Sequence, residues 1–409
     1  MKKIFILLFL SFLIVGCSSS KQTNVTEEVH NETIKEEIIE ETKDVSTSID
    51  SVDIYLDENC LSYKEITFNQ DYIYENIGRN FELKEENSIE GIEICGIYES
   101  DVQNLDKIKN GSTVNIYFPS EINGKQVLSI VGLFPYFTKT TNVTADSLMT
   151  YLNIPNSTLL LKDVDIYSGY GLIHVNDNLQ YVSGCGNIDK IVDSMKYFSG
   201  SAFLKQETFN IDGSLILDGC NIGGEINTVN IDSFSQKKNG RLYIGTNSVY
   251  SSLDNITYSN IGCVNINCDM LYEENNYFML DIVSEQLYVA DNVSFGGYIS
   301  YLLNYYYDQF ENGATIELGK NVKAAGKLGN EIIGKIDCND GVMKYIINDP
   351  SNADVLSGHL DKDVVVINKS GQEVDWHKIF PRANPNAVFV SGRLEFYNPE
   401  LTYIDVIEG

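Results

Sequence analysis

The feature that most constrains the fold of this chain is a short strand-like pattern that recurs with a fixed internal spacing. Leu287–Val289 precedes Asn292, and Ile316–Leu318 precedes Asn321 in the same way, 29 residues further along. Leu242–Ile244 is a looser copy. The tripeptide Val-Asn-Ile occurs three times, at residues 114–116, 229–231 and 264–266. A three-residue strand between turns cannot bury its apolar side alone, whereas stacked coils share one apolar core. The pattern therefore predicts a β-rich repeat protein, folded as a parallel β-solenoid.

Other segments support a fold made mainly of strands. Ile66–Phe68, Phe81–Leu83 and Ile92–Ile94 alternate apolar and polar residues with a period of two, which is typical of half-buried strands. Asn residues lie beside many such segments, where they either form ladders of aligned side chains or simply occupy turns. Tyr298–Phe310 differs because its aromatic residues have helical spacing. For this segment we expect either one amphipathic helix or tyrosines that pack on the solenoid.

The first residues predict an export signal. Met1–Lys3 is basic and Ile4–Val15 is almost wholly apolar, but this run is shorter than the roughly 20 residues of a membrane span. Ile14–Cys17 resembles the lipobox of bacterial lipoproteins, in which the cysteine receives a diacylglycerol group and becomes the new N-terminus. The resemblance implies a signal peptide over residues 1–16, lipid attachment at Cys17 and an extracytoplasmic position, anchored to the cell membrane at the cell surface. The alternative is an ordinary signal peptide followed by a chance cysteine.

Residues 17–50 predict an acidic, flexible tether. Acidic side chains there outnumber Lys21, Lys35 and Lys43, and their repulsion favours an extended segment, which is either a linker or an interaction tail. The whole chain has 29 Lys and Arg against 58 Asp and Glu, a formal net charge of −29. Such a charge repels phosphate backbones, so we expect no nucleic acid as a partner.

Two stretches resemble the leucine-rich repeats of BspA-like bacterial surface proteins. Phe81–Ile97 is similar to the β-hairpin that precedes the first coil in that family. Val114–Phe134, with the string Pro-Ser-Glu-Ile-Asn-Gly-Lys, is similar to its first repeat, and Leu152–Leu160 to the start of another. The resemblance implies a leucine-rich-repeat-type parallel β-solenoid with a small β-hairpin cap. It implies three parts: an N-terminal cap region over residues 51–110, a solenoid over residues 111–395 and a C-terminal segment over residues 396–409.

The chain departs from that family after about residue 160. The family carries Ile-Pro in nearly every repeat, yet no proline lies between Pro155 and Pro350. Ser201–Phe203 does keep the Ala-Phe pair that packs inside each coil of the family. The later coils are therefore either degenerate leucine-rich repeats or a different parallel β-solenoid joined to a leucine-rich start. Both suit a body of paired strands, because a proline inside a strand removes a hydrogen-bond donor.

The sequence contains no recognisable catalytic or metal-binding constellation, so we expect no catalytic residue, no metal and no cofactor. With Cys17 lipidated, seven cysteines remain, and we expect small buried side chains or one surface disulfide among them. No pair of histidines has metal-ligand spacing; they are His30, His174, His359 and His377. Asp337–Gly341 superficially resembles a calcium loop, but its glycine comes too early and we predict a turn. Trp376-His377, with prolines after them, predicts a cap over an open solenoid end.

These observations favour a non-enzymatic lipoprotein that presents its solenoid for adhesion or interaction. The expected partners are the membrane, through the diacylglycerol on Cys17, and an extracellular protein or glycan, with the ligand-binding residues unknown. The alternative is an exported carbohydrate-active enzyme on a β-solenoid, since two carboxylates about 5 to 10 Å apart would suffice for glycoside hydrolysis. The binding lipoprotein of an importer ranks last, because it needs the long alternating helices of two lobes.

Overall fold

The computed structural model divides the chain into two units, residues 1–48 and residues 49–409. Every described residue belongs to the second unit. The expected signal peptide, Cys17 and the tether up to residue 49 lie outside the described residues. The described residues are 50–78, 88–135, 143–144, 147–166, 170–213, 215–233, 241–245, 261–270, 279–301, 314–328, 331–338, 342–358, 364–380, 388–390, 393–395 and 404–408.

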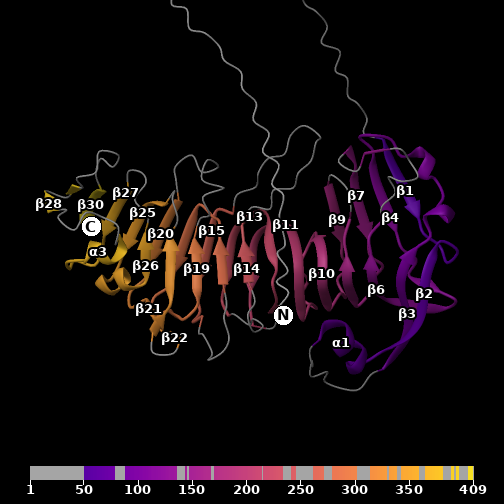
Figure 1. Ribbon diagram of the computed structural model, residues 1–409, viewed down its shortest axis with the longest axis horizontal. Helices are drawn as coiled ribbons and strands as arrows, with labels where there is room; N and C mark the ends of the chain where they lie inside the picture. The colour runs from indigo at the N-terminus through magenta and orange to yellow at the C-terminus, as the bar shows by residue number, and fades with distance from the viewer. Residues whose placement is uncertain are drawn as a thin grey trace, which may run out of the picture. The chain divides into compact units, whose positions relative to one another are not determined.

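A single sheet of 26 strands forms the body of the second unit. Neighbouring strands along this body are parallel, and Figure 1 shows them side by side from β1 to β27. This confirms the predicted β-rich, solenoid-like stack of parallel strands. The strand pairs fall into three ladders, which we call the N-terminal, central and C-terminal ladders.

The N-terminal ladder pairs six strands in parallel. They are β3 (Ile89–Ile97), β6 (Lys125–Leu133), β8 (Leu160–Val164), β10 (Tyr181–Ile188), β11 (Tyr197–Ile211) and β12 (Ile216–Leu217).

The central ladder runs along the whole stack. Besides parts of β10 and β11 it contains β1 (Ser51–Tyr55), β4 (Thr113–Tyr117), β7 (Met149–Asn153), β9 (Tyr170–His174), β13 (Asn221–Ile231), β14 (Arg241–Ile244), β16 (Met279–Ile282), β19 (Tyr298–Tyr301), β24 (Lys335–Cys338) and β26 (Leu356–Gly358).

One inward residue from each rung of the central ladder forms a single file, which we call the central file. Its members are Ile54, Ile116, Leu152, Ile173, Ile188, Ala202, Ile222, Ile244, Ile282, Tyr301, Cys338 and Gly358. Every side chain from Ile54 to Cys338 in this file is 0 % exposed. The file is the shared apolar column that the short strands need, because none of them could bury its apolar residues alone.

The C-terminal ladder starts where β11 and β13 extend past the central ladder. It continues through β15 (Cys263–Ile266), β17 (Gln286–Val289), β20 (Ala314–Leu318), β25 (Val342–Ile347), β27 (Val364–Asn368) and β30 (Ile404–Glu408). The predicted 29-residue repeat is confirmed here, because Leu287 pairs with Ile316 and Val289 with Leu318.

Asn ladders accompany the strands, as one of the two sequence alternatives predicted. The Asn265 side-chain amide donates to the Oδ1 of Asn230, and that of Asn230 to the Oδ1 of Asn210, both at 2.8 Å. The Asn321 amide donates to the Oδ1 of Asn292 at 3.0 Å. Both residues of the last pair have positive φ, 57° and 65°, a conformation that Asn adopts more readily than most side chains.

Two glycines mark corners at which one strand passes between ladders. Gly200 has φ 145°, and a Cβ there would lie 2.4 Å from the carbonyl oxygen of Cys185. Gly224 has φ 129°, and its Cβ would lie 2.1 Å from the carbonyl oxygen of Leu204. Because a side chain fits neither place, the corners of β11 and β13 require glycine.

The N-terminal region adds an antiparallel hairpin and a helix. Strand β2 (Leu61–Phe68) pairs antiparallel with β3, and between them α1 (Gln70–Ile77) packs Ile73 and Ile77 on the outer side of the N-terminal ladder. Asn69 caps the helix through a bond from the Tyr72 N–H. The expected strand at residues 81–83 lies outside the described residues. Strand β1, within residues 51–110, pairs in parallel with β4, and β30, within residues 396–409, pairs in parallel with β27.

The far end of the central ladder is closed by Phe380. It follows the short helix α3 (Trp376–Ile379) and is 1 % exposed. A Cβ on Gly358 would lie 2.6 Å from Phe380 Cε1, so the phenyl ring takes the place of the next inward side chain. Phe380 also packs edge-on against Tyr345, with ring centroids 5.3 Å apart. Phe380 lies just after Trp376-His377, on which the cap was predicted and whose side chains are not described.

The first four residues of Tyr298–Phe310 follow the second of the two alternatives for that segment, tyrosines that pack on the solenoid. Tyr298–Tyr301 is strand β19 rather than the start of a helix, because Ile299 pairs with Leu280 and Ile336, and Tyr301 enters the central file. The rest of that segment, residues 302–310, lies outside the described residues. The remaining short elements are η1 (Glu99–Asp101), η2 (Leu105–Lys107), η5 (Pro350–Asp354), β5 (Glu121–Ile122), β18 (Ser294–Phe295), β21 (Lys323–Ala324), β22 (Gly326–Leu328), β23 (Glu331–Ile333), β28 (Val388–Val390) and β29 (Arg393–Glu395).

Candidate functional site

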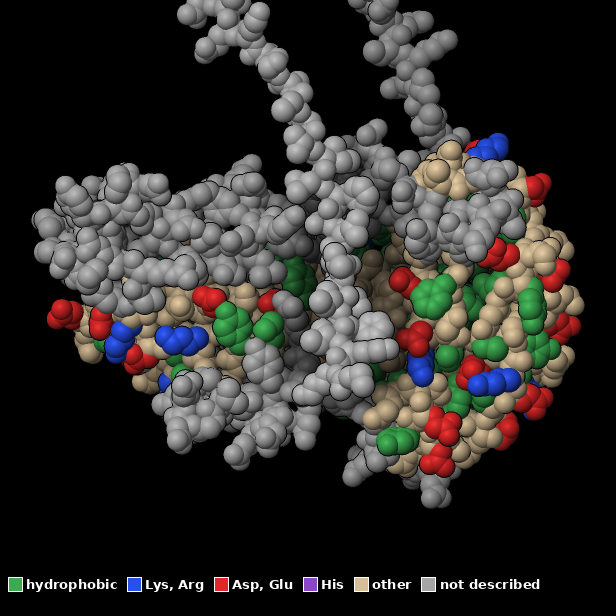
Figure 2. Space-filling model, viewed as in Figure 1, with side chains coloured by type: hydrophobic (Ala, Val, Ile, Leu, Met, Phe, Trp, Pro, Cys, Tyr) green, Lys and Arg blue, Asp and Glu red, His purple; other side chains and the backbone are tan. Residues whose placement is uncertain are grey.

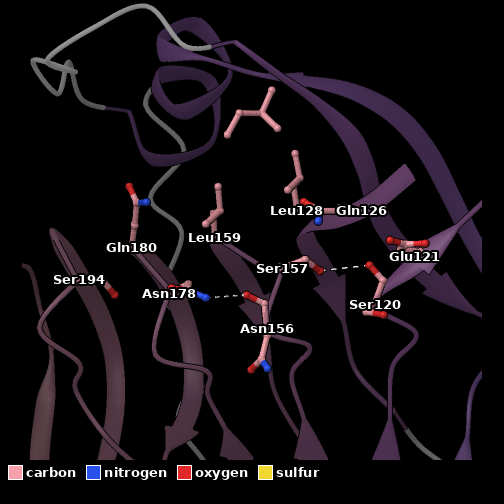
Figure 3. A pocket seen from close by; sticks show the side chains of 11 residues that line it. Ser120, Glu121, Gln126, Leu128, Asn156, Ser157, Leu159, Asn178, Gln180 and Ser194 are labelled. Atoms are coloured by element: carbon pink, nitrogen blue, oxygen red, sulfur yellow. Dashed lines mark hydrogen bonds between the residues drawn. The ribbon is translucent and has the colours of Figure 1, made fainter. Parts of the chain in front are cut away.

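A groove of about 510 Å³ crosses four successive coils beside the N-terminal ladder. Figure 3 shows its side chains on neighbouring strands and turns below α1. Its lining comes from the start of β3, the β5–β6 hairpin and the turns before β8, β10 and β11: Ile89, Ser120, Glu121, Gln126, Leu128, Asn156, Ser157, Leu159, Asn178, Gln180 and Ser194. We call it the polar groove, because hydroxyls and amides dominate this set.

The wall of the polar groove is built by backbone pairing from coil to coil. The N–H of Leu159 donates to the carbonyl of Leu128 and the N–H of Gln180 to the carbonyl of Leu159, both at 2.9 Å. The Lys196 N–H continues the series to the carbonyl of Gln180 at 2.8 Å. Each step advances by one strand spacing of about 4.8 Å, so the groove repeats with the coils.

Several side chains of the groove are committed to holding its turns in place. The Ser157 hydroxyl bonds to the carbonyls of Ser120 and Val127 at 3.1 and 2.9 Å. The Asn178 amide donates to the carbonyl of Asn156 at 3.0 Å, and the Ser194 hydroxyl bonds to two turn carbonyls at 2.8 Å each. These bonds fix the spacing of the turns before any ligand arrives.

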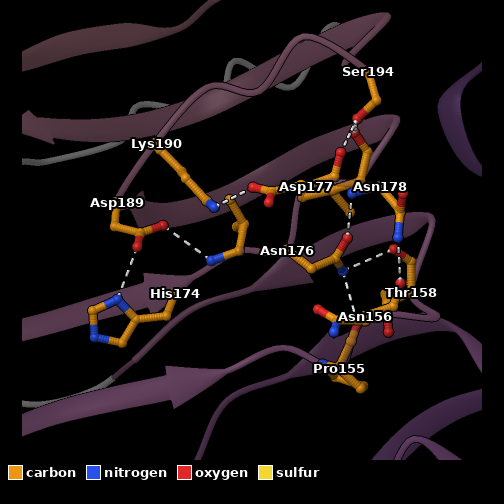
Figure 4. A network of polar contacts seen from close by, with 12 residues as sticks. Pro155, Asn156, Thr158, His174, Asn176, Asp177, Asn178, Asp189, Lys190 and Ser194 are labelled. Atoms are coloured by element: carbon orange, nitrogen blue, oxygen red, sulfur yellow. Dashed lines mark hydrogen bonds and ion pairs between the residues drawn. The ribbon is translucent and has the colours of Figure 1, made fainter. Parts of the chain in front are cut away.

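A buried asparagine supports the same turns from inside. Asn176 is 5 % exposed, and its amide donates to the carbonyls of Pro155 and Thr158 at 2.7 and 3.0 Å. Its Oδ1 accepts the Asn178 N–H at 2.7 Å (Figure 4). One side chain therefore joins two consecutive turns of the groove.

Four polar side chains of the groove remain free. The Ser120 hydroxyl, the Glu121 carboxylate and the side-chain amides of Gln126 and Asn156 make no hydrogen bond with any other described residue. They project from the rigid turns and the hairpin just described. The Asn123-Gly124 turn of that hairpin has φ 52° and 74°, as the tight two-residue turn of a hairpin needs.

The helix that overhangs the groove is anchored by a buried carboxylate. Glu93 is 3 % exposed and accepts a hydrogen bond from the Tyr72 hydroxyl, and Lys64 Nζ lies 2.9 Å from its Oε1. Burial, together with the bond to Glu93, raises the pKa of Tyr72 far above its usual value. Tyr72 therefore remains a neutral donor, and α1 stays attached to the sheet.

Two ion pairs lie next to the turn of Asn178. His174 Nδ1 lies 2.9 Å from Asp189, whose other oxygen accepts the Val175 N–H at 3.0 Å, and the Lys190 ammonium pairs with Asp177 (Figure 4). The His174 ring also stacks on Tyr151, with centroids 5.0 Å apart. His174 therefore lies among packed and paired groups.

Exposed aromatic side chains gather near the groove end of the chain. The large apolar side chains that are exposed in the described part are Tyr55, Tyr74, Ile89, Tyr98 and Phe134. Tyr55 stacks on Tyr117 with centroids 4.8 Å apart. Figure 2 shows green apolar patches among acidic side chains on this part of the surface. Of the aromatic segment Tyr298–Phe310 noted in the sequence, residues 302–310 lie outside the described residues.

The remaining residues singled out by sequence are accounted for as follows. The cysteines of the described part are all unpaired; Cys60, Cys185, Cys220 and Cys338 are buried, Cys263 and Cys268 half-buried, and Cys95 exposed. Asp337 lies in β24, and residues 339–341 of the predicted turn are outside the described part, as are His30 and His359. The His377 side chain is likewise not described. Across the described ranges, no three His, Cys, Asp or Glu side chains are grouped to hold a metal ion.

No helix in the described part of the chain is both long and apolar enough to cross a bilayer. The sequence matches no family model and no curated protein, and the fold matches no solved structure.

Proposed function

We propose that this is a bacterial lipoprotein, anchored through a diacylglycerol group on Cys17, which presents a rigid solenoid to a protein or glycan outside the cytoplasm. The observation that carries the proposal is the lipobox-like Ile14–Cys17, which an acidic tether separates from a stack of parallel strands. A stack whose core is one uninterrupted file keeps its surface rigid, which suits recognition over several coils.

The role we propose is adhesion or interaction without catalysis. The polar groove supports it, because its fixed turns hold free hydrogen-bonding groups outward, and exposed tyrosines of the same N-terminal region add rigid apolar contact area. We further propose that the coils descend from leucine-rich repeats of the BspA-like kind. The Pro119–Lys125 string supports this, since it forms the hairpin turn that opens β6.

The anchor is tested by metabolic labelling with an alkyne analogue of palmitate in cells that express the full chain. The wild type should incorporate the label and sediment with membranes, whereas Cys17→Ser should lose the label and leave the membrane fraction. Cys95→Ser is the matched control, because Cys95 is an exposed cysteine within the described fold and should keep both properties. Label retained by Cys17→Ser would contradict the anchor.

A further inference from the structure

We propose that the polar groove binds a neutral oligosaccharide laid across the coils. The inference rests on the proposed function and deepens it, because it selects a glycan over a protein and names the residues that hold it. It rests on the charge of the lining, the free side chains, the apolar side chains beside them and the paired backbone of the groove wall.

The charge of the lining disfavours anionic ligands. Among the eleven lining residues Glu121 is the one with a charge, and none is Lys or Arg. A phosphate or a uronate would therefore meet the Glu121 carboxylate on a chain of net charge −29, and the Lys196 ammonium beside the groove is already bonded to the Gln180 side-chain oxygen at 2.9 Å. A ligand rich in hydroxyls meets no such repulsion.

The free groups of the groove match a polyhydroxyl ligand. The Gln126 and Asn156 amides each offer donors and an acceptor, the Ser120 hydroxyl offers both, and the Glu121 carboxylate accepts from hydroxyl groups. Because Ser157, Asn178 and Ser194 already hold the turns, these four groups need little reorganisation to bind. Ile89, which is 39 % exposed, and the half-buried Leu159 supply apolar surface for the C–H face of a sugar ring.

The backbone around the groove disfavours an extended peptide. Peptides that bind to sheets usually add a strand to an open edge. Here the N–H groups of Val127, Leu159 and Gln180 are all bonded to neighbouring backbone carbonyls, so this wall offers a peptide no free row of donors. A peptide would have to bind through its side chains alone, whereas a glycan uses the side-chain groups that the groove offers.

The size of the groove favours an oligosaccharide over a single sugar. Its volume of about 510 Å³ lies within the usual range of ligand sites, roughly 300 to 1,000 Å³. Its four turns span three strand spacings, on the order of 14 Å. The free side chains of Gln126 and Asn156 come from successive coils, about 4.8 Å apart, and the groove continues past them over the turns before β10 and β11, so a ligand that fills it is longer than one sugar ring.

The test uses the full chain, purified in detergent, on an array of neutral and anionic oligosaccharides, with each hit quantified by calorimetry. We expect binding to at least one neutral tetrasaccharide, for example of β-linked glucose or N-acetylglucosamine, and none to hyaluronan tetrasaccharides. Gln126→Ala and Asn156→Ala should each weaken that binding about tenfold or more, as the loss of one or two hydrogen bonds requires. Asn59→Ala, at an exposed asparagine outside the groove, should leave it unchanged.

Failure to bind any neutral glycan on the array, or equal affinity in all three variants, would overturn the assignment. So would tighter binding of an anionic glycan, or a displayed peptide whose binding is lost in Asn156→Ala while no glycan binds. Release of new reducing ends from a bound glycan would support the groove as a glycan site but contradict the non-catalytic role. The binding assay does not depend on Cys17, so a failed anchor and a failed groove are distinguishable.

Discussion

The junction of Gly358 and Phe380 gives the sharpest test of the fold. A Cβ on Gly358 would lie 2.6 and 2.9 Å from two ring carbons of Phe380 and 2.9 Å from the Tyr345 hydroxyl oxygen. Such overpacking of a filled core costs about 1 to 3 kcal/mol, so Gly358→Ala should lower the free energy of unfolding by that amount. Phe380→Ala removes a ring that is 1 % exposed and should cost about 3 to 5 kcal/mol.

The double variant Gly358→Ala, Phe380→Ala tests whether the two residues share one space in the core or destabilise the protein independently. If the two sites were independent, the losses would add to roughly 4 to 8 kcal/mol. If Phe380 fills the place above Gly358, the new methyl group enters the space that the lost ring leaves. The double variant should then be no less stable than Phe380→Ala alone, which is a coupling energy of about 1 to 3 kcal/mol.

Urea unfolding of the full chain measures these losses. Far-UV circular dichroism follows the whole stack, in which Gly358 belongs to β26. Gly96→Ala combined with Phe380→Ala is the matched control, because Gly96 lies in β3 at the other end of the ladders and its effect should simply add. Additive losses for Gly358 and Phe380 would refute the proposed closure.

Three further outcomes are expected. Tyr301→Phe should cost about 1 to 3 kcal/mol in urea unfolding, because the buried hydroxyl bonds two backbone carbonyls, at 3.0 and 3.1 Å. Burial raises the pKa of Cys185 to about 12, so at pH 8 iodoacetamide should label exposed Cys95 in the native protein and Cys185 only in urea, as read by peptide mass spectrometry. Hydrogen bonds from Ser351 lower the pKa of the Asp349 carboxyl group. The ionised carboxylate therefore stabilises the fold above the ordinary aspartate pKa, and this stabilisation is lost as the pH falls through the lowered pKa. Asp349→Ala should lower the free energy of unfolding by about 1 kcal/mol at pH 7 and by less in acid.

The sequence predicted neighbouring strands well where two copies of a pattern stack directly. Val229–Ile231 and Val264–Ile266 pair in register in the C-terminal ladder. The third copy, Val114–Ile116, lies in the central ladder instead, because alternation specifies which side chains point inward but not which ladder receives the strand. Which ladder receives a strand depends on corners such as Gly200. The need for glycine there comes from close contact with the backbone of another strand, which no local sequence pattern reveals.

The polar groove was not predictable from sequence for a related reason. Its members Ser120, Asn156, Asn178 and Ser194 belong to types that occupy ordinary turns. Only the stacking of four coils of unequal length brings them to one line. Their separations along the chain follow no period, so a search for repeats cannot find them. The pairing register of the strands must be known before these residues can be recognised as neighbours.

The central file explains how an unbroken stack coexists with such an irregular sequence. Strand spacing is fixed at about 4.8 Å, so a change of size at one rung must be absorbed by the next rung or by an inserted side chain. In the central file, the large Tyr301 is followed by the smaller Cys338. The phenyl ring of Phe380 occupies the space where a side chain at Gly358 would lie. Such compensation keeps the file buried without keeping the same residue from rung to rung. An irregular repeat pattern is therefore compatible with one continuous stack.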